Sequence, residues 1–142
     1  MLSGWLGPLE NASRAALSVL SAALAASGCA SVATNAAADA VSGTGGVFAT
    51  DDDPELIESA TPFGLKTMEA LLVDVPEHED LLLSLTSGYA QYGYAFLAQD
   101  AHRLREENWE RAERLDARAR NLYDRALGYG LRGLDVRHSG FR

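Results

Sequence analysis

The sequence contains a single cysteine, Cys29, in 142 residues, and this excludes an intrachain disulfide. It has no useful stretch of alternating apolar and polar residues, the pattern of a half-buried β-strand. It also lacks a membrane-spanning run. The apolar stretch from Ala15 to Ala26 is shorter than the roughly 20 residues that cross a bilayer, and the uncharged stretch from Leu81 to Gln99 is rich in polar residues and glycine. With 47% hydrophobic residues, the chain has enough apolar material for one small core.

Basic residues are in deficit, with 12 Lys and Arg against 20 Asp and Glu and a net charge of −8. This balance argues against a nucleic-acid partner, because such binding is driven by cationic contacts with phosphate. The charge is uneven: residues 51–80 hold ten acids and one base, whereas residues 102–142 hold ten arginines and seven acids. Either these are two solvated faces, or the opposite charges meet within a protomer or between protomers.

Cys29 follows a pattern that resembles a bacterial lipoprotein signal. Arg14 precedes the apolar run, and the small residues Ala26, Ser27 and Gly28 lead directly to the cysteine. The resemblance implies a signal peptide over residues 1–28 and an acylated Cys29 that anchors the chain in a membrane. Ala30, in place of Asp, favours sorting to the outer membrane. The alternative is an N-terminal helix with an incidental cysteine.

Residues 29–50 are expected to hold the acylated cysteine, an Ala-rich stretch and a Gly-rich linker. The stretch from Ser31 to Val41 is either a short helix or a tether. Three glycines between Ser42 and Gly46 favour an irregular backbone. No Lys-Ser or Lys-Thr follows, so this is no phosphate loop.

Residues 51–142 predict an all-α domain. Asp51 to Glu55 has the acids and the proline of a helix start. We expect this helix to be kinked or interrupted near Pro62 and to end at Val75. The uncharged stretch from Leu81 to Gln99 predicts a central helix that is buried on most sides.

The last helix is expected from Trp109 to about Leu134. It carries one apolar stripe at helical spacing, formed by Trp109, Ala112, Leu115, Ala119, Leu122, Tyr123, Ala126 and Leu127. The spacing of Ala119, Tyr123 and Ala126 is that of a tetratricopeptide second helix. The sequence therefore predicts antiparallel helical hairpins of tetratricopeptide type.

No catalytic constellation is found in the sequence. The three histidines, His78, His102 and His138, lie in separate turn or helix-end contexts, and His78 opens a helix. Paired histidines at metal-ligand spacing are absent. We expect no enzyme activity, no metal and no cofactor.

The best candidate for a ligand or partner surface is an aromatic set in and beyond the central helix. Tyrosine hydroxyls can orient a ligand while the rings cover its apolar part. The alternative is ordinary packing between helices. The set consists of Tyr89, Gln91, Tyr92, Phe96 and Trp109.

Several segments in order carry a family resemblance. They are Ser42 to Leu56, Pro62 to Lys66, Gln91 to Phe96 and Leu122 to Leu134. With the leader, this pattern resembles the TatT family, the T-component of TRAP (tripartite ATP-independent periplasmic) transporters.

The resemblance implies a lipoprotein of the cell envelope that faces the periplasm. It further implies a trimer that pairs with the TRAP solute-binding protein and assists capture of hydrophobic or organic-acid ligands. Family members are longer, and where they continue past an Arg-His-Pro-Gly-Phe segment this chain has Ser139 for the proline. Residues 51–142 are therefore expected to form a truncated array. The alternatives are a helical-repeat scaffold lipoprotein for envelope assembly, or a fragment without function.

Overall fold

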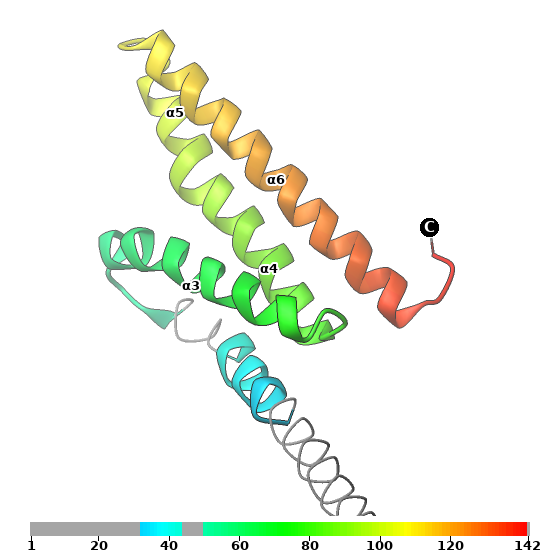
Figure 1. The fold of residues 1–142 in the computed structure, drawn as a ribbon. Helices are drawn as coiled ribbons and strands as arrows, with labels where there is room; N and C mark the ends of the chain where they lie inside the picture. Colours follow the sequence, from blue (N-terminus) through cyan, green and yellow to red (C-terminus); the bar gives the residue numbers. More distant parts are fainter. Residues whose placement is uncertain (1–31, 44–49, 142) are drawn as a thin grey trace, which may run out of the picture.

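The computed structural model describes residues 32–43 and 50–141, and the regular structure in these ranges is helical (Figure 1). This confirms the all-α prediction; the tetratricopeptide assignment stays a prediction. A helix over residues 32–42 comes first, so this part of the Ala-rich stretch is helical. The signal peptide and Cys29 lie outside the described residues. The elements that follow are α3 (Pro54–Asp74), α4 (Glu79–Tyr92), the π-helix η1 (Gly93–Ala98), α5 (Gln99–Leu104) and α6 (Trp109–Arg137).

Helix α3 begins as the sequence predicts. The carboxylate of Asp53 accepts hydrogen bonds from the backbone N–H groups of Glu55 and Leu56 at 3.1 and 3.0 Å. Pro54 occupies the first turn, where its missing N–H costs no hydrogen bond. Of the kink or interruption predicted near Pro62, the interruption is wrong, because α3 runs unbroken from Pro54 to Asp74, while the kink stays a prediction. The proline removes one helical hydrogen bond, and burial of side chains further along α3 offsets that loss.

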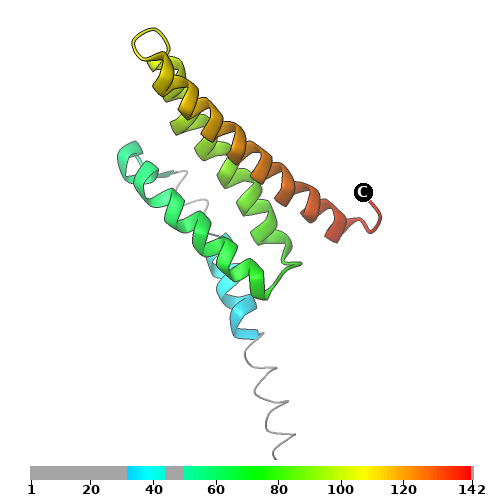
Figure 2. The same cartoon turned by 45° about the horizontal axis from the view of Figure 1, so that its top comes forward.

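The central helix is not one regular α-helix. After Tyr92 the backbone follows the wider turns of a π-helix for six residues, Gly93 to Ala98, and then returns to an α-helix in α5. We call the continuous helix formed by α4, η1 and α5 the rod. This rod and α6 lie side by side in opposite directions and form one long hairpin (Figures 1 and 2).

Small residues line the seam of this hairpin. Ala112, Ala119 and Ala126 recur every seven residues in α6 and are at most 5% exposed. Gly93 lies so close to α6 that an added Cβ would meet a ring carbon of Tyr123 at 3.1 Å. The two helices therefore approach closely because small residues face the partner helix at these positions, alanines on α6 and Gly93 opposite the Tyr123 ring.

Helix α3 crosses the half of the hairpin that holds the start of α4 (Figure 2). The core lies at this crossing, and it also takes up Ala38 from the helix over 32–42. Its most buried large side chains are Leu81, Leu82 and Leu85 of α4.

The expectation that the central helix is buried on most sides is largely confirmed: within residues 81–99 the exposed residues are Leu83, Gln91, Tyr94 and Ala95. Leu83 is 68% exposed and Tyr94 is 61% exposed. Only α3, α6 and the helix over 32–42 contribute to the packing among the described residues, so one side of the rod stays open.

Candidate functional site

A groove of about 450 Å³ lies between α3 and the rod formed by α4 and η1. It brings three of the five predicted site residues together: Gln91, Tyr92 and Phe96 line one wall. None of its lining residues is charged. The remaining lining residues are Ile57, Thr61, Gly64, Leu65, Met68, Ser84, Ser87, Gly88 and Ala95.

The π-helix shapes the aromatic wall. Tyr92 precedes η1 and Phe96 lies within it, and their ring centroids are 5.3 Å apart at an angle of 47°. Such tilted pairs are a favourable aromatic arrangement. Local π-helical turns inside α-helices are frequent at functional sites.

The hydroxyl groups of Thr61, Ser84 and Ser87, which line the groove, donate hydrogen bonds within the protein. Thr61 donates to the carbonyl oxygen of Ile57 at 2.6 Å, and Ser87 donates to that of Leu83 at 3.1 Å. An uncharged groove with these groups satisfied suits an apolar group of a ligand or partner.

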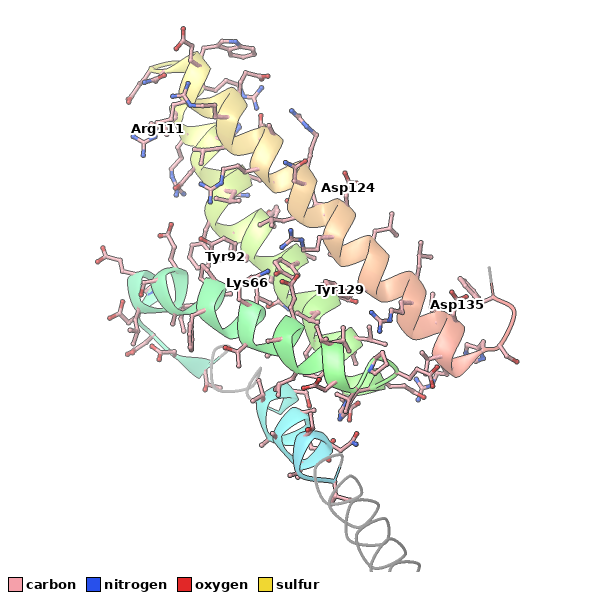
Figure 3. The ribbon with its side chains drawn as sticks, in the orientation of Figure 1. Lys66, Tyr92, Arg111, Asp124, Tyr129 and Asp135 are labelled. Atoms are coloured by element: carbon pink, nitrogen blue, oxygen red, sulfur yellow. The ribbon has the colours of Figure 1, made fainter. Side chains whose placement is uncertain are left out.

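Two charged side chains, Glu58 and Arg118, lie close enough to the aromatic wall to act on Tyr92, although neither lines the groove. Burial raises the pKa of the Tyr92 hydroxyl; the Glu58 carboxylate raises it further and Arg118 opposes the shift. Tyr92 thus stays neutral at physiological pH. Figure 3 places it where α3 meets the rod.

Tyr89 does not line this groove. It is 4% exposed and stacks on Tyr129 of α6, with ring centroids 6.1 Å apart and an interplanar angle of 10°. Its hydroxyl accepts a hydrogen bond from the Arg125 guanidinium at 3.3 Å. Tyr89 therefore belongs to a polar cluster between α3, α4 and α6.

Glu69 of α3 is the centre of that cluster. Its carboxylate accepts from the Tyr129 hydroxyl at 2.8 Å and from Arg125 at 3.4 Å. Lys66, one turn earlier, also donates to it. Burial raises the pKa of Glu69, but these donors outweigh burial, so its pKa lies below the usual value.

In the same cluster the pKa of Tyr129 is raised, whereas that of Glu69 is lowered. Burial, followed by the hydrogen bond to Glu69, raises the pKa of Tyr129 to about 12. The neutral phenol can then donate to the carboxylate over the whole physiological range.

Trp109 lies away from both the groove and the cluster. It opens α6 at the tip of the hairpin and is 58% exposed, with the Arg105 guanidinium 5.5 Å from its ring centroid. The structure thus divides the predicted surface among three places.

Sequence reasoning missed the wall that α3 contributes to the groove. Ile57, Thr61 and Met68 recur at helical spacing, which is the signal that could have indicated them. It also missed a second groove of about 480 Å³ between α4 and α6, which includes Leu83, Leu127 and Leu134.

His78 serves the fold. One ring nitrogen accepts from the backbone N–H of Leu81 at 3.3 Å, and the other lies 3.0 Å from a carboxylate oxygen of Asp39. This confirms that His78 opens a helix. Among residues 32–43 and 50–141, no three His, Cys, Asp or Glu side chains gather as metal ligands would. In the same ranges no helix combines the length and the apolar character needed to cross a bilayer.

An antiparallel helical hairpin crossed by a third helix, with apolar grooves beside it, defines an all-α protein suited to binding through grooves. Residues 50–142 match the family model described as TRAP transporter T-component, and the chain belongs to this family.

A protein of Treponema pallidum (strain Nichols), described as uncharacterized, is 36% identical to the chain over 95 residues. The alignment covers 67% of the chain and 29% of the relative, so the matched part spans less than a third of the relative's length. No solved structure matches the chain significantly.

Proposed function

We propose that this protein is an accessory component of a TRAP-type transport system that binds the solute-binding protein of that system. The observation that carries the proposal is the family match over residues 50–142. The uncharged groove between α3 and α4 supports it, because such a groove buries apolar surface of a partner or ligand.

Within this proposal, Gln91, Tyr92 and Phe96 form the contact surface. Gln91 is exposed at the rim and offers both a donor and an acceptor, while the two rings supply apolar area. Tyr89 serves to hold the rod against α3 and α6. Trp109, exposed at the hairpin tip, is a second contact point outside the groove.

We further propose that Cys29 carries a lipid anchor that holds the protein at the periplasmic face of the cell envelope. A single acyl chain binds membranes only marginally, so a diacylated cysteine with a further N-acyl chain would anchor the chain stably. Replacement of Cys29 by Ser should remove the lipid mass from the purified protein and release it from the membrane fraction. Retention of Cys29→Ser in that fraction would contradict the anchor.

The test of function is capture of the purified solute-binding protein of a TRAP system from the same genome. The purified chain, immobilised, should retain that protein from a purified stock and should not retain an unrelated periplasmic binding protein. Equal retention of both, or of neither, would count against the proposal. Whether the chain forms the homo-oligomer that the resemblance implies is a separate question. The molecular mass of the purified protein in solution, measured without any partner, answers it.

A further inference from the structure

The helix over residues 32–42 is docked on the core of the domain. Ala38 is fully buried, and Val41, one turn later, packs against the same core cluster. A helix of this length is marginal when it stands alone in water, since isolated helices need more than about 12 residues. Packing on the core therefore stabilises it, and we call it the support helix.

Two polar contacts add to this packing, and both come from α4 and the residue that caps it. Nε2 of His78 lies 3.0 Å from a carboxylate oxygen of Asp39, and the His78 side chain is only 9% exposed. The Ser84 hydroxyl donates to the carbonyl oxygen of Ser42 at 3.3 Å. Ser42 is the last residue of the support helix, and carbonyl groups at a helix end lack a partner within the helix. The two contacts therefore fix the direction of the support helix as well as its place.

These contacts bridge the Gly-rich stretch that was expected to act as a linker. Asp39 and His78 are 39 residues apart in the sequence, and Ser42 and Ser84 are 42 residues apart. Because the partners stand on either side of the stretch from Gly43 to Gly46, they join the support helix to α4 directly. The freedom of the domain relative to the support helix is therefore set by these contacts and not by the glycines.

The other end of the support helix points away from the domain. Figures 1 and 2 show its first turn directed away from α3, while the tip of the hairpin between α5 and α6 lies at the opposite end of the molecule. Val32, in that first turn, is 70% exposed. In the sequence only Ala30 and Ser31 separate it from Cys29, so the two Cα atoms are at most about 11 Å apart. An anchor on Cys29 is therefore close to the support helix.

We propose that the support helix holds the domain in one orientation on the membrane. The inference rests on the proposed acylation of Cys29. A lipid on that residue places the start of the support helix at the bilayer surface, and docking on α4 then directs the hairpin tip away from the bilayer. Trp109 at the tip faces the periplasm in this orientation, and the groove beside α3 stays at a constant height above the bilayer.

A fixed orientation favours binding of a partner from the periplasm. Ser84 lines the groove and also holds Ser42, so the support helix contacts the domain at the end of the groove nearer the membrane. A solute-binding protein then meets the tip and the groove in the same relative position in every copy. The rotational freedom of the domain is already restricted by folding, so the complex loses less entropy when it forms.

The test measures distances in the lipid-modified protein, held in phospholipid nanodiscs. Spin labels on Ala36→Cys and Asp124→Cys, two exposed positions on the support helix and α6, report the docking by double electron–electron resonance. A lipid on the Cys29 sulfur blocks that thiol, so the labels react with the introduced thiols only. The distance distribution should be narrow. Ala37→Pro should broaden it, because an internal proline breaks the support helix, whereas Ala37→Glu at the same exposed position should leave it narrow.

A second pair of labels shows whether the domain itself stays folded. Labels on Ala70→Cys of α3 and Asp124→Cys of α6 should give the same narrow distribution with and without Ala37→Pro, because residue 37 is exposed and is not part of the core. Broadening of both pairs would overturn the proposal, since residues 32–42 would then be part of the fold itself and not a support for it.

The orientation on the bilayer is measured by energy transfer from a dye on Glu107→Cys, at the hairpin tip, to acceptor dyes on the lipid headgroups. Transfer should be low in the parent protein and should rise with Ala37→Pro, since the released domain can then approach the bilayer. The proposal is also overturned if the first pair is already broad in the parent protein, or if Ala37→Pro leaves either signal unchanged. Failure of the anchor is recognised separately, because the purified protein then lacks the lipid mass before any label is attached.

Discussion

The Tyr129 hydroxyl of α6 donates a hydrogen bond to the Glu69 carboxylate of α3 at 2.8 Å. This bond joins two helices whose main packing partner in each case is α4. Together with the contact between Arg125 and Glu69, this bond links α3 directly to α6, while both helices also pack on α4. The groove keeps its shape only while α3 stays in this position.

Removal of the Tyr129 hydroxyl should therefore loosen α3. We expect Tyr129→Phe to lower the free energy of unfolding by about 1.5–3 kcal/mol, the usual range for a hydrogen bond to a charged group. Urea denaturation followed by circular dichroism measures it. The control is Tyr123→Phe, because Tyr123 is 37% exposed and its hydroxyl forms no hydrogen bond with the described residues. Equal stability of both variants would contradict the role of Tyr129.

The Glu69 cluster also predicts a pH dependence. The pKa of Glu69 in the folded protein is below its usual value of 4.5. The carboxylate therefore contributes stability that is fully present above pH 4.5, and the contribution is lost as the pH falls through the folded pKa.

Unfolding free energies of the wild type and of Glu69→Gln should thus differ at pH 7 and converge as the pH falls below 4.5. The comparison cancels the titration of the other carboxylates that the two proteins share. A difference that stays constant down to pH 3 would show that the charge on Glu69 does not stabilise α3.

The alanine seam of α6 should not tolerate a larger side chain. Ala119 faces the rod and is only 2% exposed, so the larger side chain of Ala119→Leu would force the two helices apart. Overpacking of this kind costs about 1–3 kcal/mol, which a thermal melt will register as a lower Tm. Ala117 is exposed on the same helix, and Ala117→Leu should leave the Tm nearly unchanged.

Two helical glycines should respond in opposite ways to the same change. A Cβ on Gly88 would lie 2.6 Å from a terminal methyl carbon of Leu65, so Gly88→Ala displaces that side chain from the groove and the core. Gly128 has nothing within 4 Å of its Cβ position. Gly128→Ala should raise stability by about 0.5–1 kcal/mol through helix propensity, and Gly88→Ala should fall short of that gain or lower stability. Equal gains would show that the close approach at Gly88 does not constrain the core.

The sequence predicted the helix starts and ends well because they depend on local chemistry. Asp53 with Pro54, and His78 before α4, are caps whose hydrogen bonds reach only two or three residues along the chain. The all-α class and the final helix followed from periodicity in the same way. The continuity of α3 through Pro62 was not predictable locally, because side chains from other helices offset the cost of the proline.

The candidate site was predicted less completely, because it depends on which faces of the helices pack against one another. Gln91, Tyr92 and Phe96 came from one segment and do share a wall. Tyr89 lies three residues from Tyr92, yet it turns to Tyr129, forty residues further along the chain. The π-helix after Tyr92 changes the register of the rod, and no periodicity in the sequence signals it. The wall from α3 required the three-dimensional crossing of the helices.

The most direct test of the account is the affinity of this chain for the TRAP solute-binding protein, measured by isothermal titration calorimetry. We predict saturable binding with a Kd of about 10 µM or tighter, within the range of specific protein complexes. Tyr92→Ala should weaken binding more than Tyr89→Ala, although Tyr89→Ala should lower the Tm more, since Tyr89 is the more buried of the two. No detectable binding by the folded wild-type chain would contradict the central claim.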